Sequence, residues 1–184
     1  MLVEKETKMF KVGDLIIYGI HGVCRVKDIT KLDWDTAFKD RDYYVLEPLY
    51  KGDTVYVPVD NDKVYMRPVM TKSEVLELID TMPDVDTEPY KARSIQQLAR
   101  YYQAALDSHE MTDLIKLTKI IYTKRVETEK QGKQSKTLSQ IDEKYMEHAE
   151  NLLFGEIAAV LDIPRDEVLE YIDDRLLAKK MKAI

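Results

Sequence analysis

The chain has 184 residues, of which 45% are apolar and 34% are charged, and its formal net charge is −6 at pH 7. That length suits one large domain or two small ones. The negative charge argues against indiscriminate binding to nucleic acid. The apolar runs are far shorter than a membrane span. The single cysteine, Cys24, excludes an internal disulfide framework. The N-terminus also lacks an apolar signal core. We therefore predict a cytoplasmic protein without membrane contact, in which Cys24 is buried and inert.

Strand patterns fill the first third of the chain. The β-branched runs DLIIYGI and GVCRVKDI are separated by His21-Gly22, and DYYVLEPLY and TVYVPV follow, joined by Lys51-Gly52-Asp53. Short Gly-containing connections between such runs indicate β-hairpins, and the polar residues 33–42 indicate a longer loop. Pro58 marks a strand end or an edge strand, because proline cannot donate to a ladder. Four or five strands in about sixty residues predict a small antiparallel β-barrel of SH3 or Tudor type over residues 1–69.

The pattern becomes helical from residue 70 onward. Thr71 and Glu74 have the spacing of a capping box, and an apolar stripe follows them. Ser94 and Gln97 repeat this spacing ahead of IQQLARYYQAAL. These two signals predict the first two helices of a second domain.

Three further helices are predicted along the rest of the chain. One is expected over about residues 112–126, and a long one is expected to begin at Ser139. Pro164 breaks the long helix and suits the first turn of a fifth helix. The residues expected on the inner face of the third helix are Leu114, Leu117, Ile121 and Tyr122. We therefore predict two domains in all, with an all-α domain of about five helices over residues 70–184.

Charge is distributed unevenly along the helical part. Residues 91–136 carry 10 basic and 5 acidic groups, a net of +5. Residues 72–90 carry 1 and 6, and residues 137–184 carry 6 and 11, so each of these blocks has a net charge of −5. A basic island between acidic blocks is compatible with a nucleic-acid contact and equally with solvated helix faces.

The sequence contains no motif that indicates an enzyme. Its early glycines are too widely spaced for a phosphate loop, and no Gly-Lys-Ser/Thr follows them. The three histidines lie in different elements without metal-ligand spacing, and no Gly-x-Ser-x-Gly elbow is present. A hydrolase with dispersed carboxylates would need a pocket with perturbed acids, to which nothing here points. We predict no enzymatic activity, no metal or cofactor, and no small-molecule substrate.

The opening run FKVGDLIIYGIHGVCRVKDI, continued by YYVLEP and TVYVPVDN, resembles the N-terminal domain of the CarD/CdnL family of bacterial transcription regulators. Farther on, LSQIDEKYMEHAENLLFGEIA resembles the fourth-helix signature of that family, so the resemblance extends over roughly residues 9–161. The first motif is also similar to the polymerase-interacting module of transcription-repair coupling factors. The helical part favours the CarD branch.

The resemblance implies that the barrel binds the protrusion lobe of the RNA polymerase β subunit by strand-to-strand augmentation, which requires an exposed edge strand. The run DTVYVPV would supply that edge, and Lys27 and Lys31 on the neighbouring strand would add charge at the rim. Tyr56 occupies the position at which actinobacterial members carry an arginine, and its ring can replace an ion pair by buried area. The alternative is that Tyr56 only covers the barrel. The expected polymerase-binding residues are Lys27, Lys31, Thr54, Val55, Tyr56 and Val57.

For the helical domain, the resemblance implies a contact with promoter DNA at the upstream edge of the melted bubble, where a family tryptophan wedges into the minor groove. Ile95 stands at the matching position, and the only tryptophan, Trp34, lies in the expected barrel loop. Isoleucine can also act as such a wedge. The alternative is that Ile95 packs into the helical core. The expected DNA-binding residues are Arg93, Ile95, Arg100, Lys119 and Lys124.

Two functions follow from these expectations. The first is a polymerase-bound regulator that modulates promoter open complexes. Its DNA contact would be weak and dependent on polymerase, because Glu143 and Glu150 stand where many relatives carry basic residues. The second is a polymerase-bound adaptor whose helical domain binds another protein instead of DNA.

Overall fold

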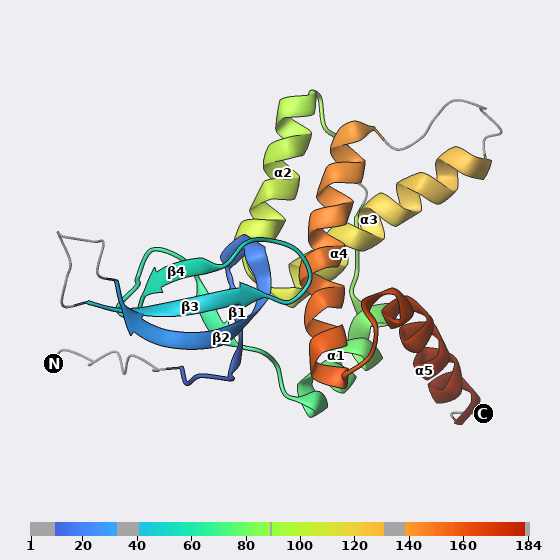
Figure 1. Ribbon diagram of the computed structural model, residues 1–184. Coiled ribbons are helices and arrows are strands. Elements are labelled where there is room, and N and C mark those ends of the chain that lie inside the picture. Colours follow the sequence, from blue (N-terminus) through green and yellow to red (C-terminus); the bar gives the residue numbers. More distant parts are fainter. Residues whose placement is uncertain (1–9, 33–40, 89, 131–138, 183–184) are drawn as a thin grey trace, which may run out of the picture. The chain divides into compact units, whose positions relative to one another are not determined.

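The computed structural model describes residues 10–32, 41–88, 90–130 and 139–182 (Figure 1). Trp34 and most of the expected loop at 33–42 lie outside this part of the chain. Two compact units divide between Val69 and Met70, where the sequence pattern changes from strands to helices. Each unit is described by itself.

The N-terminal unit is a single antiparallel sheet of five strands, in the order β4-β3-β2-β1-β5. The last strand returns beside the first, so β4 and β5 are the two edges of the sheet within the described residues (Figure 1). This arrangement confirms the predicted small antiparallel β domain. The strands are β1 (Leu15–Tyr18), β2 (Gly22–Lys31), β3 (Asp42–Pro48), β4 (Val55–Pro58) and β5 (Met66–Pro68).

The core of the sheet is formed by side chains that alternate along its strands. Ile16, Cys24 and Leu46 are fully buried there, and Phe10 closes one end by donating its N–H to the Tyr44 hydroxyl at 3.0 Å. Burial raises the pKa of the Cys24 thiol to about 11, so the reactive thiolate is suppressed at neutral pH. The prediction that Cys24 is buried is confirmed.

Glycines shape the connection between β1 and β2. A short 3-10 turn, Gly19–His21, joins the two strands, and Gly19 (φ +45°) and Gly22 (φ +70°) both have positive φ. A Cβ added to Gly19 would lie 2.9 Å from Val64 Cγ1. Glycine is favoured at this position because other residues rarely adopt such a backbone and an added Cβ would press against the Val64 side chain.

The C-terminal unit consists of five α-helices, as predicted, joined in two places by 3-10 turns. The third helix begins one residue earlier and ends four residues later than expected. Pro164 lies just before the 3-10 turn Arg165–Glu167 and therefore outside the fifth helix. No described helix is long and apolar enough to span a bilayer. The helices are α1 (Lys72–Thr81), α2 (Ile95–Asp107), α3 (Met111–Lys130), α4 (Gln140–Leu161) and α5 (Val168–Lys182).

Side-chain caps explain where the first two helices begin. Thr71 accepts a bond from the N–H of Glu74, whose carboxylate accepts one from the Thr71 N–H, so this capping box is complete. Ser94 accepts from the N–H of Gln97 at 3.1 Å. The Gln97 side chain reaches past Ser94 and accepts from the Arg93 N–H at 2.9 Å. The second box is therefore shifted by one residue from the expected pattern.

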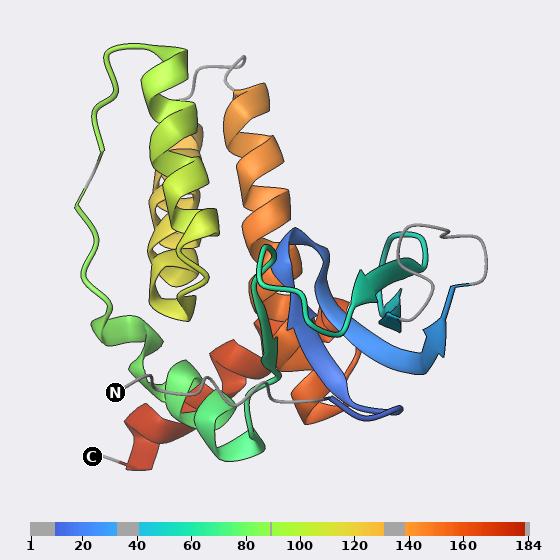
Figure 2. The same cartoon turned by 90° about the vertical axis from the view of Figure 1, so that its left-hand side faces the viewer.

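Helix α4 is central to the helical unit. Its N-terminal part packs with α2 and α3, and its C-terminal part packs with α1 and α5 (Figures 1 and 2). Leu114, Leu117 and Ile121 of α3 are buried in the shared core, as predicted. Tyr122 was expected there too, but its side chain is 56% exposed. It follows Ile121 directly, and one residue turns the helix by about 100°, away from the core.

A buried carboxylate of α4 holds the first residue of the helical unit. Glu156 is 1% exposed, and its Oε1 accepts a hydrogen bond from the Met70 N–H at 2.8 Å. Met70 directly precedes the cap of α1. The start of the unit is therefore bonded to a helix that lies 86 residues later in the sequence.

Candidate functional site

Strand β4 is the edge strand that the sequence pointed to, and its pairing shows which backbone groups face outward. It pairs with β3 in the register Val45↔Tyr56 and Tyr44↔Val57, and the Val59 N–H donates to the Asp42 carbonyl at 2.9 Å. Backbone groups alternate in direction along a strand. Those of Val57 therefore face β3, whereas those of Tyr56 point toward the open edge.

The side chains of β4 alternate in the same way. Tyr56 is 48% exposed, whereas the side chain of Val57 is 2% exposed and lies in the core. Thr54, just before the strand, is exposed as well. Pro58 has no N–H to offer at the open edge, so it limits the length over which another strand can pair with β4. The outward surface of this edge is thus centred on Tyr56.

The two predicted rim lysines do not lie on the strand next to β4. Lys27 and Lys31 belong to β2, and β3 separates β2 from β4. The expectation that they lie on the strand beside the edge strand is therefore wrong, because β3 pairs with β4 and β2 is the next strand inward. Lys27 also forms an ion pair of 3.0 Å with Glu47 of β3. Both side chains are about half exposed, so this pair contributes little to stability.

The predicted DNA wedge, Ile95, is the first residue of α2 and is 68% exposed. The alternative that it packs into the helical core is therefore wrong. Arg93 is also exposed and lies two residues before it. Arg100 is exposed on the same helix, but five residues turn it by roughly 140° away from Ile95. The structure brings Arg93 and Ile95 together and places Arg100 on another side of α2.

An aromatic stack fixes the segment that leads into α2. The rings of Tyr90 and Tyr101 are parallel within 5° and their centroids are 3.9 Å apart. Tyr101 in turn contacts Tyr102, which packs against Tyr145 of α4. The residues just before Ile95 are thereby attached to the face of α2. Tyr90 was not among the expected site residues, although a tyrosine in the segment between two predicted helices was a visible signal.

Lys119 of α3 has partners inside the helical unit. Its ammonium group donates to the carbonyls of Met82, Pro83 and Val85 at 2.6–3.3 Å. These carbonyls belong to the turn that follows α1. Lys119 therefore closes this turn onto α3, which is a structural role that its sequence position did not reveal.

Lys124 of α3 binds a carboxylate that is otherwise buried. Its Nζ lies 2.7 and 2.8 Å from the two carboxylate oxygens of Asp142, which is 1% exposed. The hydroxyls of Tyr102 and Ser139 also donate to Asp142, at 2.8 and 2.7 Å. Burial alone would raise the pKa of Asp142, but hydrogen bonds from these three side chains and the charge of Lys124 outweigh it and hold the pKa below its ordinary value. The network joins α2, α3 and α4.

Two of the expected sites therefore present an exposed apolar side chain, namely the β4 edge at Tyr56 and the start of α2 at Ile95. Neither brings together groups for acid–base or nucleophilic chemistry. Among the residues that the structure describes, no three His, Cys, Asp or Glu side chains gather as a metal ion would require.

The N-terminal unit has the exposed sheet edge that binding by strand addition requires. Residues 10–70 match the family described as the CarD-like/TRCF RID domain, and the match spans all five strands. The N-terminal unit therefore belongs to this family of polymerase-interaction domains, as the sequence resemblance indicated. A search of curated proteins finds no match.

Proposed function

We propose that the protein is a bacterial, cytoplasmic transcription regulator that binds the β subunit of RNA polymerase through β4 and modulates promoter open complexes through its helical unit. The observation that carries this proposal is the position of β4. It is an edge strand, centred on the exposed Tyr56, within a domain of the polymerase-interaction family. No enzymatic activity is part of this proposal.

In this proposal the β subunit adds a strand beside β4. The outward backbone groups of Thr54 and Tyr56 would supply hydrogen bonds, and the Tyr56 ring would supply buried area. Pro58 would end the pairing. Lys27 and Lys31 would act at most at the rim, because β3 lies between their strand and the docking edge.

Hydrogen exchange of the purified chain, with and without RNA polymerase, tests this docking mode. Polymerase is expected to slow amide exchange over residues 53–58, because the added strand takes up outward-facing amides. Residues 66–68 on the opposite edge should keep their exchange rates. Slowed exchange at β5 with no change at β4 would contradict the proposed edge.

The helical unit is proposed to reach promoter DNA through the first turn of α2. Three features support this proposal, namely the exposure of Ile95, the neighbouring Arg93, and the cap and stack that hold the segment. Lys119 and Lys124 belong to the same proposal by sequence. Because the ammonium groups of Lys119 and Lys124 are bonded within the helical unit, Arg93 and Ile95 are better supported as DNA-contacting residues.

Ile95→Ala is expected to shorten the lifetime of the melted promoter complex, and Ile95→Trp is expected to lengthen it. A wedge occupies the gap left by unstacked bases, and a contact of this kind contributes about 1–3 kcal/mol. The lifetime is measured with a DNA competitor on polymerase that is saturated with each variant. Polymerase affinity and melting temperature should stay unchanged, because Ile95 is exposed.

Ile20→Ala provides a matched control for the Ile95 variants. Ile20 is 70% exposed, so this change removes the same atoms from an equally exposed position in the other unit. It should leave the lifetime of the complex unchanged. Equal lifetimes of the melted promoter complex with Ile95→Ala and with Ile95→Trp would contradict the proposal that Ile95 inserts into DNA, and would favour the adaptor function. That second function is supported by the acidic residues Glu143, Glu147 and Glu150 along α4.

A further inference from the structure

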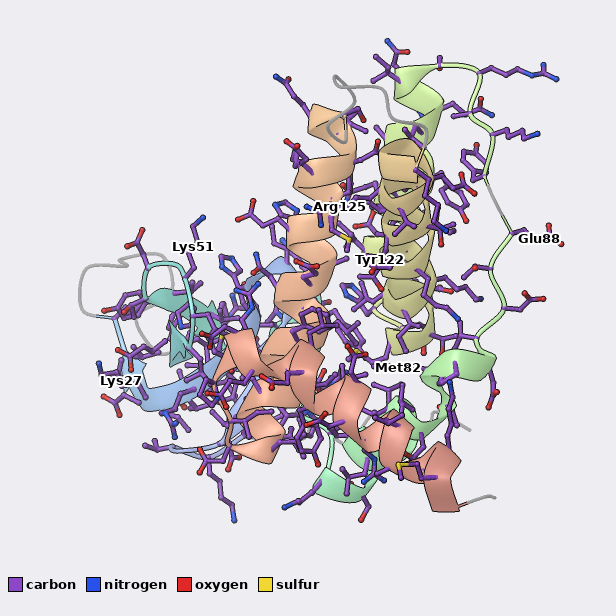
Figure 3. The ribbon with its side chains drawn as sticks, turned by 90° about the vertical axis from the view of Figure 1, so that its right-hand side faces the viewer. Lys27, Lys51, Met82, Glu88, Tyr122 and Arg125 are labelled. Carbon is purple, nitrogen blue, oxygen red and sulfur yellow. The ribbon has the colours of Figure 1, made fainter. Side chains whose placement is uncertain are left out.

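The helical unit has an apolar groove that neither proposed surface uses. It has a volume of about 340 Å³, and α3, α4, α5 and the turn after α1 form its walls. Met82 contributes from the turn after α1, Tyr122 and Phe154 contribute from α3 and α4, and Leu169 and Leu176 contribute from α5. Figure 3 shows Met82 and Tyr122 on the side of the unit that faces the viewer.

The two walls of the groove carry exposed apolar side chains. Tyr122 of α3 and Leu169 of α5 are each 56% exposed, although both line the same groove. Single exposed apolar residues are common on protein surfaces, but a gathering of them around a concave apolar surface marks an interaction site. An amphipathic helix binds to a groove of this kind by laying its apolar face between the two walls.

The charges that line the groove have a negative balance. Lys119 lies in the wall, but its ammonium group is bonded to the three carbonyls of the turn after α1. Glu150 and Asp173 supply carboxylates. Burial raises the pKa of Glu150, and the nearby Arg165 and Arg125 only partly offset that effect. A positive group that enters the groove would find a partly desolvated carboxylate there.

The acidic character continues along the outer rim. Residues 165–174 carry five carboxylates and a single arginine. Glu170 and Asp173 are three residues apart on α5, so they lie on one face of the helix beside Leu169 and Leu176, and Asp166 lies in the 3-10 turn just before α5. A ligand that fills the groove must therefore combine an apolar stripe with positive charges along one side.

We propose that this groove binds an amphipathic α-helix of a partner protein, with leucine-like residues in the groove and a row of lysine or arginine residues against the acidic side of α5. An apolar face at i, i+3, i+4 and i+7 would contact Tyr122 and Leu169 on the two walls. The row of basic residues would face Glu170 and Asp173 of α5. This inference depends neither on polymerase binding nor on the DNA contact.

Fluorescence anisotropy with the full chain tests the proposal. The probe is a labelled amphipathic helical peptide built from leucine and lysine, and the comparison peptide has glutamate at every lysine position. The lysine peptide is expected to bind, and the glutamate peptide is expected to bind at least about tenfold more weakly, because carboxylates line the rim. Failure of the lysine peptide to bind would overturn the proposal, as would equal binding of both peptides.

Two matched variants separate the groove from general attraction to an acidic protein. Leu169→Glu and Leu177→Glu each add one negative charge to α5 at side chains that are 56% and 58% exposed. Only Leu169 lines the groove. Leu169→Glu should weaken binding of the lysine peptide by about tenfold or more, since it places a charge in the apolar contact. Leu177→Glu should leave binding unchanged or tighter, and equal affinities of the two variants would overturn the proposal.

Discussion

Tyr56→Glu is expected to abolish polymerase binding in a pull-down while the barrel stays folded. Tyr56 lies at the centre of the β4 edge with its side chain 48% exposed, so the substitution leaves the core intact. In the proposed complex it would place a charge where water must be excluded. Changes at such central aromatic positions commonly cost about 2–4 kcal/mol, or roughly 30- to 700-fold in Kd.

Tyr65→Glu is the matched control for this prediction. Tyr65 is 40% exposed and precedes β5, at the opposite edge of the same sheet. Both variants therefore lose a half-exposed tyrosine and gain one negative charge in the same domain. Normal polymerase binding by Tyr56→Glu, together with an unchanged melting temperature, would remove β4 from the interface.

Lys124→Met is expected to lower the free energy of unfolding by about 3 kcal/mol, because it leaves the buried carboxylate of Asp142 without its counter-ion. This value is at the low end of the range for buried pairs, since the Lys124 side chain is itself 46% exposed. Urea denaturation measures the loss. Arg125→Met, at the next and exposed position of α3, should change stability by less than about 0.5 kcal/mol.

The Asp142→Asn change supplies the second test of this network. The double variant Lys124→Met/Asp142→Asn should recover part of the stability, because no buried charge then lacks a partner. An equal or larger loss in the double variant would contradict this account. The result also bears on DNA binding, because a destabilised Lys124→Met protein cannot be used to assign a phosphate contact.

The same pair predicts a dependence of stability on pH. The folded state lowers the pKa of Asp142, so the stabilisation is complete above the unfolded pKa and is lost as pH falls through the lower folded value. The difference in stability between the wild type and Lys124→Met should therefore be largest near neutral pH. It should shrink in acid, where Asp142 becomes protonated in both proteins.

Local signals in the sequence were sufficient for most of the fold. The turn at His21-Gly22, the caps at Thr71 and Ser94, and the change of pattern at residue 70 depend on neighbouring residues. The prediction that Tyr122 is buried was wrong because Tyr122 lies at the margin of the apolar stripe, where a shift of one residue separates buried from exposed positions. A periodic pattern does not fix that margin.

The candidate site was less accessible from sequence, since it depends on contacts between distant residues. The edge strand was expected from the family resemblance, and Pro58 was a local signal that indicated either a strand end or an edge strand. That Lys27 and Lys31 are one strand farther away follows only from the strand order. The partners of Lys124 and Lys119 lie 18 and 34–37 residues away in the sequence, and no local motif announces them.

The bond between Met70 and Glu156 bears on how the protein matures during synthesis. The barrel contains every strand that it needs once residue 68 has left the ribosome, whereas the Met70 N–H must wait for an acceptor 86 residues later. At about 5–20 residues per second, that interval is roughly 4–17 s. The nascent chain thus has a window in which the docking edge can be complete while the helical unit is still being made.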